Sequence, residues 1–135
     1  MVEFLESELI RHPRLYSEKN SFLSSNTDPY QYQEKKSRIT AEILQVFAGL
    51  RLPVSVSILT KSSLVLRDLE LLRQIPTISV GLTLTTLERQ MARALEPLAH
   101  DPLARLRTLE KLSSAGIITY AFLGPLLLYY LQRRI

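Results

Sequence analysis

The chain has 135 residues and a net charge of +4, which is enough for one domain with a hydrophobic core and too short for two comfortable ones. Apolar residues make up 46% of the sequence and charged residues 22%, values typical of globular proteins, so neither a disordered nor a fibrous protein is indicated. The sequence contains no cysteine, which excludes disulfides and thiolate metal ligands from this polypeptide. We expect a single domain over residues 1–135.

The two ends of the chain indicate neither export nor a membrane span. The first eight residues contain three glutamates and no apolar core of signal-peptide length. The most apolar stretch, residues 117–131, is interrupted by Gly124-Pro125 and is shorter than the ~18 to 20 residues that a membrane span needs. We expect a buried strand with an irregular tail there, and a cytoplasmic protein without a membrane contact.

The first half of the chain alternates helical and extended patterns. Apolar residues at helical spacing predict a first helix that ends near Pro13. A short strand is expected around residues 21–25. Apolar spacing then predicts a second helix over about 37–50, and the alternating segment 54–59 reads as the next strand.

The second half continues the alternation. The expected elements are a third helix that Ser62 or Ser63 begins and Pro76 ends, a strand over 78–84, a fourth helical segment over 85–95, a fifth helix between Pro102 and Gly116, and a strand over 117–123. Thr85 and Glu88 match a capping box, which would place the start of the fourth helical segment at Thr85.

Four strands separated by helices predict an α/β fold with parallel pairing and right-handed crossovers. In strand 54–59, Val54, Val56 and Ile58 alternate with Ser55 and Ser57. An apolar face under helices, opposed by a face of small polar side chains, favours a partial (β/α) barrel over a doubly wound sheet, with helices on the outer face and an elongated polar ligand inside. The alternative is that short strands simply tolerate serine and threonine.

In β/α folds the ligand site lies at the carboxyl ends of the strands. In this sequence those ends are polar or conformationally special: Asn26, Thr27 and Asp28, then Thr60 and Lys61, then Thr83 and Thr85, and finally Gly124 and Pro125. The proline after Asp28 biases that residue to an extended backbone. Its carboxylate would then accept a hydrogen bond from a ligand amine or ribose hydroxyl, or it would satisfy nearby backbone donors in an Asx turn.

The other candidates also have structural alternatives. Lys61 would pair with a ligand carboxylate or phosphate, or would be a solvated lysine beside a helix start, and Thr85 would face the ligand or cap a helix. His12 and His100 stand beside prolines or an Asp-Pro pair, where helix punctuation explains them. No nucleophile with a base and no phosphate-cradling glycine loop is recognisable.

Four blocks of the sequence carry a resemblance, and they occur in the order and spacing of one known group: SSNTDPYQYQEKKSRITAEIL at 24–44, VSILTKSSLVLRDLELL at 56–72, VGLTLTTLERQMARALEP at 80–97 and RLRTLEKLSSAGI at 105–117. The chain resembles the middle portion of radical S-adenosylmethionine (radical SAM) proteins of the group related to spore photoproduct lyase, described as DNA repair photolyase-like.

The resemblance implies a partial barrel with S-adenosylmethionine across the strand ends. Asn26, Thr27 and Asp28 would face the methionine part of the cofactor. Lys61, and Thr83 with Thr85, would lie near its carboxylate or ribose. The family cleaves this cofactor reductively at a [4Fe-4S] cluster that a CxxxCxxC loop holds, and the present sequence has none of those cysteines.

The resemblance therefore predicts a truncated radical SAM domain that lacks the first barrel strand with its cluster loop and the last strands. We expect such a chain to be inactive alone, so whether it is an enzyme stays open. The alternatives are a module that binds S-adenosylmethionine or a nucleotide, and one half of a split barrel completed by a cysteine-bearing partner chain. Exposed sheet edges would also permit self-association, while the charge of +4 is only a weak argument for nucleic acid.

Overall fold

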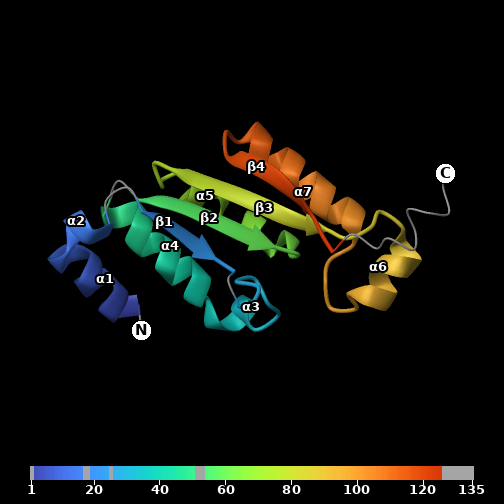
Figure 1. Ribbon diagram of the computed structural model, residues 1–135, viewed down its shortest axis with the longest axis horizontal. Coiled ribbons are helices and arrows are strands. Elements are labelled where there is room, and N and C mark those ends of the chain that lie inside the picture. The colour runs from blue at the N-terminus through green and yellow to red at the C-terminus, as the bar shows by residue number, and fades with distance from the viewer. Residues whose placement is uncertain (1, 17–18, 25, 51–53, 126–135) are drawn as a thin grey trace.

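A computed structural model describes residues 2–16, 19–24, 26–50 and 54–125 of the chain. Its sheet has the order β1-β2-β3-β4 and all three pairings are parallel. The strands are β1 (Asn20–Leu23), β2 (Ser55–Thr60), β3 (Ile78–Leu84) and β4 (Ile118–Leu123). Figure 1 shows these strands running side by side toward the end of the molecule where α6 lies. The predicted α/β fold, a fragment of a barrel with parallel strands, is confirmed.

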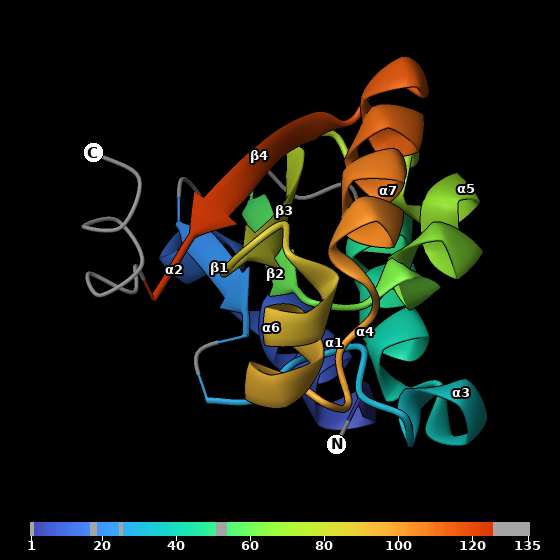
Figure 2. The same ribbon diagram turned by 90° about the vertical axis from the view of Figure 1, so that its right-hand side faces the viewer.

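Helices cover one face of the sheet, as Figure 2 shows for α4, α5 and α7. The helical elements are α1 (Val2–Arg11), α2 (Pro13–Tyr16), α3 (Glu34–Ser37), α4 (Ile39–Leu50), the 3₁₀ helix η1 (Ser63–Asp68), α5 (Leu69–Leu72), α6 (Arg89–Leu95) and α7 (Pro102–Ser114). Helix α1 packs against α4, and α7 packs against β3 and β4. Among the described residues, no helix has both the length and the apolarity needed to cross a membrane.

The hydrophobic core lies between these helices and the apolar face of β2 and β3. Ile58, Val80 and Leu82 are fully buried there, as are Leu44 of α4 and Leu112 of α7. Each such aliphatic side chain contributes roughly 1.5–3 kcal/mol when it leaves water. The alternation seen in the sequence thus identifies the helix-covered face correctly.

On the opposite face, the two central strands carry small side chains beside the ring of Tyr120. Ser79 donates a hydrogen bond to Ser57 across neighbouring strands (3.1 Å), and the Ser57 hydroxyl lies 3.2 Å from the hydroxyl of Tyr120. Gly81 pairs with Tyr120 in the sheet, and a Cβ atom at Gly81 would lie 2.3 Å from the tyrosine ring. Glycine at 81 therefore makes room for a ring that lies over the polar face.

Two helices differ from the prediction. The helix expected over about 37–50 is α4, which begins only at Ile39 because Arg38 adopts a left-handed conformation (φ 52°) that separates it from the short helix α3, which was not predicted. The third helix begins as predicted, with Ser62 accepting a hydrogen bond from the amide of Leu64, but its first six residues form a 3₁₀ helix and only Leu69–Leu72 is α-helical. Helix α2 was not predicted.

The capping box at Thr85 and the buried fourth strand are wrong. Helix α6 begins at Arg89, with Glu88 at its N-cap in an extended conformation, so Thr85 lies outside the helix. Strand β4 is at the edge of the described sheet, and Ile118, Phe122 and Leu123 are 66%, 50% and 62% exposed. The predicted tail over residues 126–131 lies outside the described residues.

Candidate functional site

A cavity of about 310 Å³ opens at the carboxyl ends of the strands. It brings together five predicted site residues, Asn26, Thr27, Asp28, Lys61 and Thr83, with Ser24, Leu59, Thr60, Phe122, Gly124 and Pro125. The sixth predicted residue, Thr85, does not line this cavity. Convergence follows from the fold, because parallel strands end at the same edge of a sheet.

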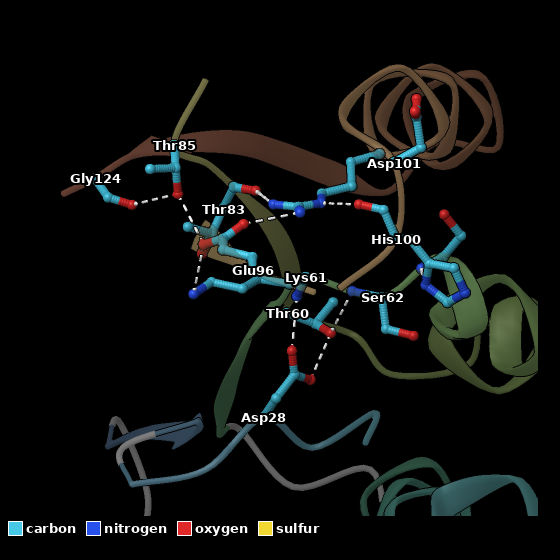
Figure 3. Close-up of polar contacts among 12 residues, drawn as sticks. Asp28, Thr60, Lys61, Ser62, Thr83, Thr85, Glu96, His100, Asp101 and Gly124 are labelled. Carbon is cyan, nitrogen blue, oxygen red and sulfur yellow. Dashed lines mark hydrogen bonds and ion pairs between the residues drawn. The ribbon is translucent and has the colours of Figure 1, made fainter. Parts of the chain in front are cut away.

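The carboxylate of Asp28 is held by the protein itself. Its Oδ1 accepts hydrogen bonds from the amide of Tyr30 (2.9 Å) and the hydroxyl of Thr60 (2.6 Å), and its Oδ2 accepts one from the amide of Lys61 (2.7 Å). Figure 3 shows the contacts with Thr60 and Lys61. The Asx-turn interpretation of Asp28 is therefore confirmed, and the same side chain ties the 26–30 segment to the end of β2.

A charged cluster of Lys61, Glu96 and Arg105, which we call the strand-end cluster, lies beside the cavity. The Glu96 carboxylate accepts from Lys61 Nζ, from Thr85 Oγ1 and from Arg105 Nη2, each at 2.8 Å (Figure 3). Thr85 also donates to the carbonyl of Gly124 at 3.3 Å. Glu96 thus connects the ends of β2 and β3, and through Thr85 the end of β4, to the end of α6.

Arg105 lies on the buried side of the strand-end cluster and holds it in place. Its side chain is 1% exposed, and its Nη1 and Nε donate to the carbonyls of Thr83 (2.8 Å) and His100 (2.7 Å). Its three donor nitrogens bond to two backbone carbonyls and the Glu96 carboxylate, which suits a buried guanidinium. Thr83 therefore contributes its backbone to Arg105, while the residue also lines the cavity.

The strand-end cluster has two cations and one carboxylate. Burial by itself would raise the pKa of Glu96, but hydrogen bonds from Lys61, Thr85 and Arg105 outweigh it and lower that pKa. Glu96 is consequently ionised at neutral pH, and Arg105 already supplies a buried counter-charge. The ammonium of Lys61, whose side chain is 40% exposed against 10% for Glu96, is the surplus positive charge.

His100 links the loop before α7 to the start of η1. Its Nδ1 accepts a hydrogen bond from the amide of Ser63 at 2.9 Å, which requires an unprotonated nitrogen at that position. Burial, with the charges of Lys35 and Arg105, lowers the pKa of His100. Its observed contacts are structural, in agreement with the helix-punctuation interpretation.

A second charged cluster, which we call the turn cluster, consists of Glu34, Arg67 and Asp68. Arg67 donates two hydrogen bonds to Asp68 (2.8 and 2.7 Å) and one each to the carbonyl and carboxylate of Glu34 (both 2.9 Å). The hydroxyl of Thr40 donates to the carbonyl of Pro29 at 2.6 Å. These contacts hold the segment after Asp28 against η1 and α4, and so keep the predicted trio of residues at the strand ends.

Glu96 and Arg105 were not among the predicted site residues. Each has the charge that the helix macrodipole disfavours at its position, because Glu96 is the C-cap of α6 and Arg105 lies in the first turn of α7. Acids are favoured at helix N-termini and cations at C-termini. An acid and an arginine in the opposite positions are a sequence signal for partners elsewhere in the fold, and here they pair with one another.

The residues at this site fit the two implied cofactors differently. The strand-end cavity offers an ammonium, amide and hydroxyl groups and a carboxylate, which suit a zwitterionic amino acid joined to a ribose. An iron–sulfur cluster requires thiolate ligands, and the sequence has no cysteine. The described residues also contain no group of three or more His, Asp or Glu placed to hold a metal ion.

Comparisons with known proteins identify relatives by sequence and a solved structure with the same fold. No family model matches the chain. An uncharacterized protein of Methanocaldococcus jannaschii is 36% identical over 106 residues, covering 78% of this chain and 40% of the relative, and one of Mycobacterium bovis is 33% identical over 109 residues, covering 78% and 31%. The chain therefore spans less than half the length of these relatives.

A solved structure shows the same fold. The chain superimposes on a mutant of spore photoproduct lyase with a TM-score of 0.72 and 12% sequence identity, over 92% of this chain and 36% of that protein. At this identity the likeness is one of architecture. The chain thus has the fold of about a third of a spore photoproduct lyase.

Proposed function

We propose that this chain is a radical SAM-type barrel fragment that binds S-adenosylmethionine at the strand-end cavity. The observation that carries the proposal is the convergence of Asn26, Thr27, Asp28, Lys61 and Thr83 on one cavity at the carboxyl edge of a parallel sheet. Ligands of α/β proteins bind at this edge. The fold shared with spore photoproduct lyase and the sequence blocks resembling radical SAM proteins support the identity of the ligand.

Different residues of the cavity would contact different groups of S-adenosylmethionine. Lys61 would pair with the carboxylate of S-adenosylmethionine. If Lys61 leaves its ion pair with Glu96, Glu96 is still neutralised by Arg105. Asp28 uses three of its roughly four acceptor positions within the protein, which leaves one for the ligand ammonium. The hydroxyl of Thr83 and the amide of Asn26 would meet the ribose or the carboxylate.

The reductive step is not assigned to this chain alone. A [4Fe-4S] cluster supplies the electron in the radical SAM group that the sequence resembles, and no residue of this sequence could supply its thiolates. We infer that the fragment binds the cofactor but does not cleave it unless cysteines come from another polypeptide segment.

A second proposal is that another chain completes the barrel. Both outer strands, β1 and β4, have an unpaired edge in the described sheet, and Phe22, Ile118 and Phe122 expose about half or more of their surface. Unpaired edges bind further strands, and the matched relatives are more than twice as long as the matched region. Co-expression with a cysteine-bearing partner should then give a stable complex on gel filtration.

Titration calorimetry with S-adenosylmethionine tests the first proposal. We expect saturable heat, weakened about tenfold by Lys61→Met, because a hydrogen-bonded ion pair with the ligand carboxylate is lost. Arg107→Met is the matched control, because Arg107 is exposed on α7 and lines neither this cavity nor its neighbours. Absence of heat at millimolar ligand would refute cofactor binding.

Reconstitution tests the absence of cleavage. The purified chain treated with iron, sulfide and reductant is expected to yield no brown chromophore and no 5′-deoxyadenosine from S-adenosylmethionine. Formation of both by this chain alone would refute the assignment of a binding role without cleavage.

A further inference from the structure

A second and larger cavity, of about 720 Å³, lies next to the strand-end cavity, and we propose that it binds a small amphipathic anion, that is, an apolar body carrying one anionic group. We call it the loop cleft, because the segments 30–35 and 95–100 form its sides. Its lining residues are Asp28, Tyr30, Gln31, Tyr32, Gln33, Lys35, Lys61, Ser62, Leu64, Leu95, Glu96, Pro97, Leu98, Ala99 and His100.

The apolar part of the ligand is indicated by the side chains of the cleft. Leu64, Leu95, Pro97 and Leu98 supply aliphatic surface, and Leu98 and Tyr32 are 101% and 76% exposed. Small-molecule sites are concave and largely apolar with a few polar groups that fix orientation. A leucine fully open to water beside an exposed tyrosine gains by contact with such a ligand.

The anionic part is indicated by two ammonium groups. Lys35 forms no ion pair among the described residues, and its Nζ lies 5.2 Å above the ring of Tyr32. Lys61 is the surplus cation of the strand-end cluster and is 40% exposed. The charge of Lys35 also reaches His100 on the opposite side of the cleft, where it helps to lower the pKa of that histidine.

The two carboxylates of the cleft offset only part of this positive charge, because Glu96 is neutralised by the buried Arg105 and Asp28 alone is left to balance the two ammonium groups. Asp28 is engaged by two backbone amides and Thr60, and Glu96 by the buried Arg105 and by Thr85. Their hydrogen-bonding capacity is therefore turned largely toward the protein. A ligand phosphate, sulfonate or carboxylate would meet the two ammonium groups and not a free carboxylate.

The loop cleft and the strand-end cavity share Asp28 and Lys61. A ligand in the cleft would thus lie beside the one proposed for the strand ends, as a second reactant does. The cleft proposal itself does not require S-adenosylmethionine, and two residues separate the sites: Lys35 lines only the cleft, and Thr83 lines only the strand-end cavity.

The test uses 1-naphthyl phosphate as probe, with 1-naphthol and inorganic phosphate as its separate halves. In amide NMR spectra of the full chain, we expect the probe to shift signals of residues 31–35 and 97–100, and each half to bind at least about tenfold more weakly. Lys35→Met should weaken the probe about tenfold and leave S-adenosylmethionine binding unchanged. Thr83→Val should do the reverse, and Arg107→Met should change neither.

The outcomes separate the two proposals. Probe binding that maps to the cleft and depends on Lys35 supports the cleft whether or not S-adenosylmethionine binds. Binding of 1-naphthol as tight as that of the phosphate, shifts confined to other residues, or indifference of the probe to Lys35→Met in a folded variant would each overturn it. Loss of S-adenosylmethionine binding alone would refute only the proposed function.

Discussion

The strand-end cluster and the turn cluster are both built from three charged groups but have opposite charge balance. The strand-end cluster sets Lys61 and Arg105 against Glu96, whereas the turn cluster sets Arg67 against Glu34 and Asp68. In the turn cluster the carboxylates are 5% and 1% exposed and all three kinds of guanidinium nitrogen are used. In the strand-end cluster one cation remains partly in solvent.

This difference indicates two roles. A guanidinium that saturates two buried carboxylates cannot leave without exposing both to an apolar environment, so the turn cluster is structural. A carboxylate with two cations can release one of them to a ligand and still be neutralised. The strand-end cluster accordingly leaves the ammonium of Lys61 available for a ligand. Three predictions test that distinction, and a fourth concerns the pH dependence of His100.

The largest effect is expected from Arg105→Met. The substitution removes the buried counter-charge of Glu96 and the hydrogen bonds to the carbonyls of Thr83 and His100. We expect the free energy of unfolding in urea to fall by about 3–5 kcal/mol. Arg107→Met, on the exposed side of α7, should change it by less than about 0.5 kcal/mol. Equal effects of the two variants would contradict a structural role for Arg105.

A slightly smaller loss is expected from Arg67→Met, because the side chain of Arg67 is 22% exposed and water can partly replace it. Two buried carboxylates lose their donor, and we expect about 2–4 kcal/mol of destabilisation in the same assay. Arg67→Lys is the conservative variant. It keeps the charge but cannot reproduce a planar fork of donors, so it should recover only part of the loss. Full recovery would show that charge alone matters.

Lys61→Met should cost little stability, about 0–1 kcal/mol, since its ion pair is 40% exposed on the lysine side and solvent screens it. The variant should nevertheless bind both S-adenosylmethionine, through its carboxylate, and the proposed amphipathic anion about tenfold more weakly. Stability by urea unfolding and affinity by calorimetry should thus move independently. A loss of stability as large as that of Arg105→Met would place Lys61 with the structural groups.

The strands and the site edge were predictable because their signals are local. Alternation identified the buried faces of β2 and β3, and strand β3 was placed at its observed bounds, Ile78–Leu84. Residues that follow parallel strands must meet at one edge, so the trio beginning at Asn26 could be brought to Lys61 and Thr83 without knowledge of the fold's details.

The remaining features depend on partners that are distant in sequence. Apolar residues at i and i+3 share a side in both α and 3₁₀ helices, so η1 could not be distinguished from an α-helix. Arg38 gives no local sign of a left-handed backbone. Strand β4 has the composition of a buried strand, and only its edge position in the described sheet exposes it. The packing of the Tyr120 ring over Gly81 likewise could be predicted only from the pairing register of β3 and β4.

The smallest effect concerns the pH dependence of stability that follows from the burial of His100 and the positive charges near it. Burial, then Lys35 and Arg105, lower the pKa of His100 below its ordinary value of about 6.5. Because the unfolded chain binds the proton more tightly, the contribution of His100 to stability is present above about pH 6.5 and is lost as pH falls through the lower pKa of the folded state. Urea midpoints should therefore decline less steeply on acidification in His100→Asn than in the wild type.

His12→Asn is the matched control, since His12 is exposed and lies outside the site, and it should follow the wild-type profile. Lys35→Met sharpens the test, because removing one of the charges that act on His100 should raise the pKa of His100 in an NMR titration. The same change weakens the proposed anion site, so a single positive group would account for both observations. An unchanged pKa of His100 in Lys35→Met would mean that the ammonium of Lys35 does not act on the opposite side of the loop cleft. Lys61 would then be the one remaining cation that argues for an anion there.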